Sequence, residues 1–343
     1  MHSITDVLRR FKQDWTKELS PDTIAQACRD AGMQWYESAL NPVVTIQVFF
    51  VQILHGNTAI EHLSHLTGLS FTAAAYCKAR MRFPLEVLYA LLQRCVEQLH
   101  QDAFDTGRWL GHRVFHVDGS SFSMPDTPQL QAHFGQPGGQ QPGCGFPTAR
   151  WLVLLHAGTG MITKMLASPL RTHDMSKTAQ LHPELQTGDL LVADRGFCSY
   201  PHLALLFQRG VHGLLRIHPR TIVDFTRGRS HLLFLEGKGK RQRKTPHSRW
   251  LKQLGATDQI VQWFRPRCRP RWMSKEQFQT LPAALTVREL RYMIHEKGFR
   301  PIEITLVTTL LDAKRYTFPD LAELFRQRWA KFPRNTAKPI SDT

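Results

Sequence analysis

Two apolar stretches of this 343-residue sequence each end in an aspartate, and they constrain the fold more than any other feature. "RVFHV" runs into Asp118, and "DLLVA" runs into Asp194. The second stretch is continuously apolar, which is typical of a strand buried on both faces of a sheet. A carboxylate at the mouth of such a strand is costly to desolvate unless a cation shares its site. The sequence therefore predicts a helix-covered sheet with acids at two strand ends.

The segments around these stretches predict the remaining elements of the sheet. "ARWLVLLHAGTGMITKMLASPL" predicts an antiparallel hairpin that turns at Gly158-Thr159-Gly160. "HDMSKTAQLHPEL" and "SYPHLALLFQRG" predict helices, and "VHGLLRI" predicts a strand. "IEITLVTTLLD" and "FPDLAELFRQRW" then predict a final strand and a final helix. This order indicates an α/β protein (α+β mixed sheet) with helices packed against the sheet.

The first 105 residues show helical spacing of apolar residues instead, with Pro21, Pro42 and Pro84 at the boundaries. Two short helical segments flank Thr67-Gly68. They are compatible with a helix-turn-helix whose second helix carries Lys78, Arg80 and Arg82 toward DNA. They are equally compatible with an ordinary helical hairpin in a bundle, so both interpretations stay open.

The charge is unevenly distributed along the chain. Residues 1–200 hold 16 Lys+Arg and 17 Asp+Glu, whereas residues 201–343 hold 28 and 11, so the net charge of +16 arises from the last part. Such a field attracts a polyanion, and we expect nucleic acid rather than an anionic membrane, because no basic amphipathic helix with a lipid-facing stripe is present. The longest apolar run, "VVTIQVFFVQIL", is too short to span a bilayer.

Basic residues in the segment 221–300 are concentrated in two runs, "KGKRQRK" and "RPRCRPR". We interpret them as phosphate clamps rather than base readers, because reading a base requires a few placed side chains and not a block of charge. The candidate DNA-binding residues are Lys238, Lys240, Arg241, Arg243, Lys244, Arg265, Arg267, Arg269 and Arg271.

Four tryptophans between residues 151 and 272 are interleaved with arginines. Trp151, Trp250, Trp263 and Trp272 are candidates for stacking on DNA bases, with core packing as the alternative. Arg195, next to Asp194, is a candidate phosphate contact or an ion-pair partner. The six cysteines form no CxxC pair, which argues against a zinc site and a disulfide scaffold and favours a cytosolic, reduced protein.

The two strand-end aspartates suggest a metal site. On neighbouring strands, Asp118 and Asp194 would offer oxygen ligands to Mg²⁺, which proteins usually hold by one or two carboxylates plus water and phosphate. Paired metals of this kind activate a water or a 3′-hydroxyl and stabilise the leaving oxygen of a phosphodiester. The alternative is that each aspartate is only a cap or turn residue.

Together, "FHVDGSSFSM", "LLVADRGFCSY", the hairpin order and "FRQRW" on a last helix resemble the DDE transposases of insertion sequences. The similar group carries the signature Tyr-x-x-Arg-x-x-x-Glu-x-x-x-x-x-x-Lys on that helix, and the resemblance covers about residues 110–330. It implies a ribonuclease-H-like catalytic core, with Asp118 and Asp194 as the first two metal-binding acids. It also implies Mg²⁺ (or Mn²⁺) in a two-metal site if the site is complete.

The resemblance further implies partners and a division of the chain. The partners would be double-stranded DNA, as transposon ends and target, and a second chain in a homodimer on DNA, without a membrane or a small-molecule substrate. The location would be the bacterial cytoplasm, in association with the nucleoid. The expected regions are a helical N-terminal region that is a candidate for contacting DNA (1–108), the first part of the core (109–220), a basic strand-rich insertion (221–300), the last core strand with the start of the catalytic helix (301–330) and an aberrant tail (331–343).

The signature is only half present on the last helix. Aligning Arg328 with the signature arginine places Phe325 at its tyrosine, Phe332 at its glutamate and Pro339 at its lysine. Glu323 falls on the opposite helix face from position 332, so it does not replace the third acid. Pro333 also disfavours a continuing helix. We expect that the reading frame is interrupted just after Trp329, with a diverged C-terminus as the alternative.

Three functions follow from these observations. The first is a DDE transposase that catalyses Mg²⁺-dependent DNA cleavage and strand transfer, inactive in this chain because the third acid is missing. The second is a non-catalytic DNA-binding remnant that inhibits a full-length transposase by occupying DNA ends. The third is a different nuclease built on the same core.

Overall fold

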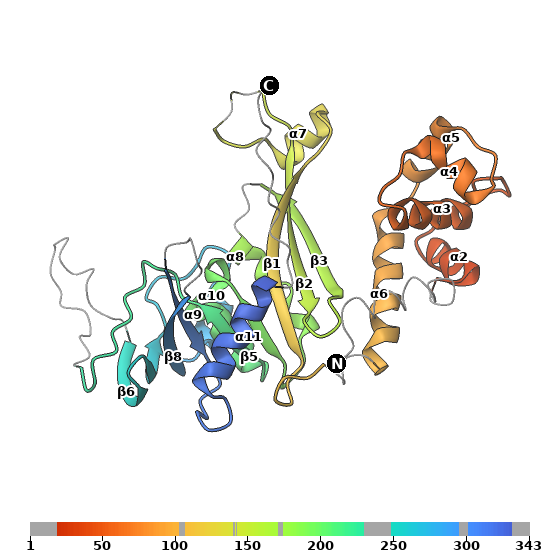
Figure 1. The fold of residues 1–343 in the computed structure, drawn as a ribbon. Coiled ribbons are helices and arrows are strands. Elements are labelled where there is room, and N and C mark those ends of the chain that lie inside the picture. The colour runs from red at the N-terminus through yellow and green to blue at the C-terminus, as the bar shows by residue number, and fades with distance from the viewer. Residues whose placement is uncertain are drawn as a thin grey trace. The chain divides into compact units, whose positions relative to one another are not determined.

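The computed structural model describes residues 19–102, 107–139, 141, 143–170, 174–229, 248–294 and 301–330. The chain divides into two compact units. One comprises residues 1–107 with 158–163, and the other comprises residues 108–157 with 164–343. Each unit is described by itself below, with elements labelled as in Figure 1.

The N-terminal unit is helical, as the spacing of its apolar residues predicts. Polar N-caps start several helices: Ser20 accepts a hydrogen bond from the Thr23 amide, and Asn41 accepts one from the Val44 amide. Gly68 ends α4 in the left-handed conformation (φ +67°), where a side chain would be strained. The helices are α2 (Pro21–Asp30), α3 (Pro42–Leu54), α4 (Ile60–Thr67), α5 (Ala73–Met81) and α6 (Leu85–Asp102).

These helices bury two apolar clusters. Ile24, Cys28, Ile46 and Leu91 belong to the cluster between α2, α3 and α6, and Leu63 and Tyr76 join α4 and α5 to α3. Within the part of the chain that the structure describes, no helix combines the length and the apolar character needed to cross a membrane.

The second unit is built on one large sheet. In the described residues nine strands lie in the order β3-β2-β1-β4-β5-β9-β8-β7-β6. Their bounds are β1 (Val114–Ser123), β2 (Thr148–His156), β3 (Ile162–Pro169), β4 (Leu190–Ala193), β5 (His212–Arg216), β6 (Ser248–Gly255), β7 (Asp258–Phe264), β8 (Ala284–Ile294) and β9 (Ile302–Thr308).

The first five strands form the core that the resemblance implies. β1 pairs antiparallel with β2 and parallel with β4, and β4 pairs parallel with β5. The helix α9 (Tyr200–Gln208) connects the two parallel strands and packs on β5. The expected mixed α/β fold with a ribonuclease-H-like core is therefore confirmed, including the β2–β3 hairpin that turns at residues 157–161.

The strands of the segment 221–300 continue this same sheet. β9 pairs antiparallel with β5 on one side and with β8 on the other, and β7 and β6 follow at the edge. A short helix, α10 (Lys275–Thr280), precedes β8 and starts with a capping box between Ser274 and Gln277. The boundaries expected for an insertion remain a prediction, but its strands share the hydrogen-bonded sheet of the core.

One predicted helix is much shorter than expected. The segment "HDMSKTAQLHPEL" forms only α8 (Asp174–Thr178) and the 3₁₀ turn η1 (His182–Glu184). Pro183 lies within η1 and has no N–H to donate, which disfavours one continuous α-helix through the segment, although α8 already ends at Thr178.

The last described helix, α11 (Phe318–Ala330), covers one face of the sheet. Leu321, Leu324 and Phe325 project from α11 into a cluster with buried residues of β1, β4, β5 and β9, such as Val114 and Val192. Figure 1 shows α11 in dark blue across the sheet. This packing fixes the direction in which the following turn of α11 presents its side chains.

Two buried ion pairs support the same sheet away from its strand-end aspartates. Arg113 binds both oxygens of Asp189, with N–O distances of 2.7 Å. Arg288 on β8 binds both oxygens of Asp258 on β7, at 2.8 and 2.5 Å, and also donates to the Tyr316 carbonyl. In both pairs the side chains are at most 8% exposed.

Candidate active site at the ends of β1, β4 and β5

The sheet brings Asp118 and Asp194 next to each other. Val117 on β1 pairs with Ala193 on β4 in parallel register, so the two aspartates follow at the same level of neighbouring strands. Both strands are fully buried up to that point, and exposure begins at the aspartates. The carboxylates thus lie where a buried sheet meets solvent.

Each of these carboxylates uses one oxygen for contacts within the protein. Oδ1 of Asp118 accepts hydrogen bonds from the Gly119 amide (3.0 Å) and from Arg328 (3.1 Å). Oδ1 of Asp194 accepts one from the Arg195 amide (2.7 Å) and lies 3.6 Å from Arg216. Among the described residues, no hydrogen bond to either Oδ2 is present, since the hydrogen bonds of both carboxylates go to Oδ1. Each aspartate therefore presents one carboxylate oxygen to a ligand.

Arg328 reaches this site from α11. The residue is 2% exposed, and its guanidinium donates to the Val117 carbonyl (3.2 Å) as well as to Asp118. Burial lowers the pKa of Arg328, while the nearby charges of Asp118 and Asp194 oppose that shift and Arg216 adds to it. Arg328 thus lies within electrostatic reach of both acids, whereas the other signature position, Phe325, is a fully buried core residue.

Arg216 is a site residue that the sequence analysis missed. Arg216 is the last residue of β5. Leu215, the residue before it, pairs with Val307 on β9 on one side and with Ala193 on β4 on the other. The sequence feature that could have indicated Arg216 is its position at the end of the apolar stretch that forms β5, the strand next to β4, which ends just before Asp194. Recognising it required the register of β4 and β5, which pairs Ala193 with Leu215.

The described residues hold no group of three His, Cys, Asp or Glu side chains that could bind a metal ion. Phe332, at the position expected for the third acid, lies outside them. Glu323 is engaged elsewhere, because it accepts hydrogen bonds from Arg326 and Gln327 on the exposed side of α11. The two carboxylates with their open oxygens fit one hard divalent cation that is completed by water and phosphate. They do not by themselves complete a two-metal site.

The candidate DNA-binding arginines differ in their surroundings. Arg195 is exposed beside Asp194. Nη1 of Arg265 donates to the carbonyls of Phe278, Gln279 and Leu281 and so caps the C-terminal end of α10. Arg269 donates to the Met273 carbonyl.

The two other arginines of that run, Arg267 and Arg271, are exposed. The basic run at Lys238, Lys240, Arg241, Arg243 and Lys244 lies outside the described residues. Arg265 and Arg269 of the predicted phosphate clamp therefore have hydrogen bonds within the protein, and Arg267 and Arg271 are exposed.

All four candidate stacking tryptophans have contacts within the protein. Trp263 donates to Glu289 (2.7 Å), Trp250 donates to Gln253 (3.2 Å), and Trp272 stacks on His202 with ring centroids 4.7 Å apart. Trp151 differs from them because it lies on β2 beside β1, the strand that carries Asp118.

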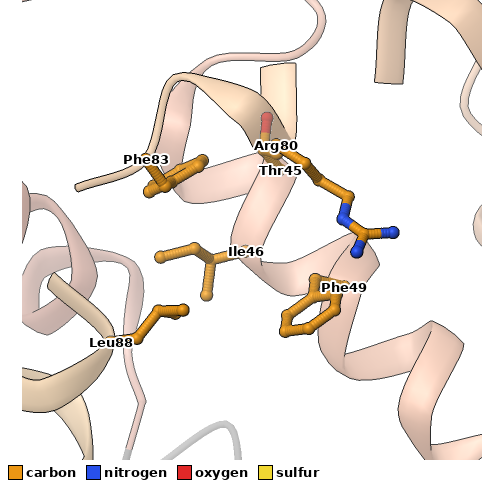
Figure 2. A pocket seen from close by; sticks show the side chains of 6 residues that line it. All are labelled: Thr45, Ile46, Phe49, Arg80, Phe83 and Leu88. Atoms are coloured by element: carbon orange, nitrogen blue, oxygen red, sulfur yellow. The ribbon is translucent and has the colours of Figure 1, made fainter. Parts of the chain in front are cut away.

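In the N-terminal unit, the predicted second helix of a helix-turn-helix is α5, which carries Lys78 and Arg80; Arg82 is its C-cap. The Arg80 guanidinium lies 4.8 Å from the Phe49 ring centre and 3.3 Å from the Gln52 oxygen. Figure 2 shows it beside a small pocket of about 50 Å³, lined by Thr45, Ile46, Phe49, Arg80, Phe83 and Leu88. Arg80 thus has intramolecular contacts, whereas Lys78 and Arg82 are exposed. Both interpretations of α4 and α5 remain open.

Comparisons with known proteins agree with this arrangement. A family model described as "Transposase DDE domain" matches residues 109–330. Among curated proteins, "Putative transposase InsZ" of Escherichia coli (strain K12) is 24% identical over 148 residues. That match covers 42% of this chain and 48% of the relative, so the chain is matched to about half of the relative's length.

Two solved structures show remote similarity. The piggyBac transposase synaptic complex with hairpin DNA has a TM-score of 0.37 at 9% identity, covering 96% of this chain and 68% of that chain. The Mos1 transposase paired-end complex with the left transposon end has a TM-score of 0.21 at 9% identity, covering 53% and 60%.

Proposed function

The chain belongs to the transposase DDE domain family, and from this premise we propose that it derives from an insertion-sequence transposase that binds transposon ends and cuts and joins DNA. The observation that carries this proposal is the pair Asp118 and Asp194, each with one carboxylate oxygen open to a ligand and an arginine beside the other. The proposed partners are transposon ends and target DNA, bound by a homodimer in the cytoplasm at the nucleoid.

The proposed ligand of the two open oxygens is Mg²⁺ or Mn²⁺. A divalent cation held there would lower the pKa of a bound water or 3′-hydroxyl and would stabilise the leaving oxygen of the phosphodiester. The backbone amides of Gly119 and Arg195 and the guanidinium of Arg328 hold the two carboxylates in fixed positions for this ligand.

The two arginines supply positive charge for the DNA. Arg216 and Arg328 balance the two carboxylates. A divalent cation added to this set would therefore leave an excess of positive charge. A DNA phosphate between the arginines would neutralise that excess, because guanidinium groups bind phosphate oxygens with strong, charge-assisted hydrogen bonds. We infer that metal and DNA bind to this site together.

We further infer that this chain does not complete the reaction. Two carboxylates are available, and Phe332 stands at the position of the third acid. Phosphoryl transfer depends mainly on positioning and charge, so the loss of one metal carboxylate weakens it severely. The proposed cause is an interruption of the reading frame after Trp329. Translating the other forward frames of the gene tests it: a Glu three residues past Trp329 and a Lys seven further on support the interruption, and their absence from every frame contradicts it.

An assay with supercoiled DNA and Mg²⁺ or Mn²⁺ tests the activity. We expect no cleavage and no strand transfer by this chain, and therefore no change when Asp118→Asn or Asp194→Asn is introduced. Robust metal-dependent cleavage that either substitution abolishes would overturn the inferred inactivity. Cleavage without joining and without preference for particular ends would indicate a different nuclease on the same core.

The second candidate function is a DNA-binding remnant that occupies transposon ends and inhibits a full-length transposase. The strong positive charge of residues 201–343 and the exposed Arg267 and Arg271 favour it. Steeply salt-dependent binding of DNA without cleavage is the expected result, because each neutralised phosphate releases counterions. The absence of DNA binding at low salt would contradict both candidate functions.

A further inference from the structure

Beyond Asp118, β1 continues as part of an exposed arm. The residues Gly119–Ser123 are all exposed, in contrast to the buried first part of the strand. They pair with the start of β2, where Trp151 lies opposite Ser120 and Ala149 lies opposite Phe122. Figure 1 shows this ribbon extending away from the sheet toward α7 (Pro128–Phe134), which follows β1. The arm begins at the candidate active site.

One face of the arm continues the face that carries Asp118. Side chains two residues apart on a strand point to the same side, so Asp118, Ser120 and Phe122 share a face, and Trp151 belongs to it through its pairing with Ser120. The rings of Phe122 and Trp151 are 5.1 Å apart between centroids at an angle of 53°. Phe122 is 40% exposed. An aromatic pair therefore lies on the acids' side of the ribbon.

The polar atom of this pair lacks a partner. The indole Nε1 of Trp151 is buried and has no hydrogen-bond partner among the described residues. Buried indole N–H groups usually have one. Trp250 and Trp263 satisfy theirs inside the protein, and Trp272 is stacked on His202. Trp151 is thus distinguished from the other candidate tryptophans by both its position and its incomplete contacts.

We propose that Phe122 and Trp151 form a stacking platform for one unpaired nucleobase of the DNA strand whose phosphate is bound at Asp118 and Asp194. This inference rests on the proposed function. At about 3.3 Å per residue, Ser120 and Phe122 lie roughly 7 and 13 Å along β1 from Asp118, a span that adjoining nucleotides cover. The flat face of any base can stack on an aromatic ring, so the platform would be tolerant of sequence.

The composition of the arm favours nucleic acid over a protein partner. Apart from Phe122, the exposed half of β1 is formed by Gly119, Ser120, Ser121 and Ser123. A stable protein interface buries roughly 800 Å² on each partner around an apolar centre, which the exposed half of β1, with one phenylalanine among serines, does not offer. Serine hydroxyls bind phosphate and sugar oxygens. The exposed Arg195 adds positive charge at the base of the arm, where Arg216 and Arg328 balance the two aspartates.

The test uses the full chain with Mn²⁺ present, because metal and DNA are inferred to bind this site together, and it measures DNA binding rather than catalysis. The probes are a blunt duplex and the same duplex with a short single-stranded extension that contains 2-aminopurine, whose fluorescence is quenched by stacking. We compare Phe122→Ala and Phe122→Leu, which both remove the stacking ring, with Phe207→Ala, which removes another exposed phenylalanine (57% exposed, against 40% for Phe122) from α9. Affinity is measured by anisotropy, and folding by circular dichroism and thermal unfolding.

We expect the extension to strengthen binding and its 2-aminopurine to be quenched. Phe122→Ala and Phe122→Leu should each lower the affinity for the extended DNA by about tenfold and remove the quenching. Both should leave the affinity for the blunt duplex unchanged, and Phe207→Ala should behave like the unmodified chain. Phe122→Leu retains an apolar side chain, so it separates loss of stacking from loss of packing.

Three results would overturn the platform. If DNA binds but the Phe122 variants match Phe207→Ala, the platform is refuted while the proposed DNA binding stands. If folded Phe122 variants change the oligomeric state in light scattering instead of the quenching, a second copy of the chain is the occupant. If no DNA binds even at low salt, the proposed function fails and the platform fails with it.

Discussion

The Arg–Asp pairs of the sheet fall into two kinds. One kind stabilises the fold, and the other lies at the candidate active site. In Arg113–Asp189 and Arg288–Asp258, both carboxylate oxygens are bound and both side chains are buried. Arg328 donates a hydrogen bond to one oxygen of Asp118, Arg216 lies 3.6 Å from Asp194, and the two aspartates are 39% and 22% exposed. The same two residue types hold strands together in the first kind and leave an oxygen for a ligand in the second.

The largest expected effect concerns stability. Arg288→Ala leaves Asp258 buried without its partner, so we expect it to lower the free energy of unfolding by about 3–5 kcal/mol. Arg216→Ala removes a longer, partly solvated contact and should cost only about 1 kcal/mol or less. Urea unfolding followed by circular dichroism measures both. Equal losses for the two variants would break the distinction between the two kinds of pair.

The second expected effect is a loss of stability at acidic pH, so the two kinds of Arg–Asp pair should be compared near pH 7. Burial, with help from the charges of His202 and Arg209, lowers the pKa of His182 to about 3 from its usual 6.5. Between about pH 3 and pH 6.5 the unfolded chain therefore binds a proton at His182 that the folded chain does not bind. The free energy of unfolding consequently falls as the pH drops below 6.5. At pH 5 the loss should be about 2 kcal/mol.

Urea unfolding at several pH values tests this effect of His182. His182→Leu should flatten the dependence of the unfolding free energy between pH 7 and pH 5. An unchanged slope in this variant would assign the acid sensitivity to other groups.

The third expected effect concerns metal affinity. Asp118→Asn and Asp194→Asn should each weaken Mn²⁺ binding by at least about tenfold, since even partners of metal ligands have effects of that size. Asp320→Asn changes an exposed acid at the start of α11 and is the matched control. Electron paramagnetic resonance of free Mn²⁺ gives the affinities without requiring catalysis. Identical Mn²⁺ affinities in all three variants would show that Asp118 and Asp194 contribute no more to metal binding than the control residue Asp320.

The smallest expected effect extends the comparison to the arginines after β7. Arg271 is exposed, whereas Arg265 caps α10 through three carbonyls. Arg271→Ala should weaken DNA binding and reduce the salt-dependence slope by about 1. Arg265→Ala should lower stability and leave the slope unchanged. DNA-binding titrations at several salt concentrations measure both slopes. A reduced slope for Arg265→Ala alone would show that Arg265, and not Arg271, contacts a DNA phosphate.

The sequence predicted those parts of the structure that depend on local patterns. The two acids at strand ends, the hairpin turning at residues 158–160 and the helix through Leu321 and Phe325 all follow from the spacing of apolar residues, and the structure contains them. Whether the acids bind metal is still a prediction, as is the role of the basic runs.

Features that depend on contacts between distant segments could not be predicted in this way. Arg216 belongs to the site because β4 and β5 pair in a particular register, and Arg265 caps a helix that begins ten residues later in the chain. No local pattern in "RPRCRPR" distinguishes the capping Arg265 from the exposed Arg271. Likewise, the continuation of the core sheet into β8, β7 and β6 depends on pairing with β9.

The pairing of β5 with β9 also governs how this sheet can form during synthesis. Leu214 on β5 finds its partner Thr308 only after the whole intervening segment has left the ribosome. Until then β5 is an open edge with unpaired amides and carbonyls, which can pair with another chain. Contacts between residues so far apart in sequence also slow folding. The nascent protein therefore passes through a stage in which half of its sheet exists and its central edge is exposed to aggregation.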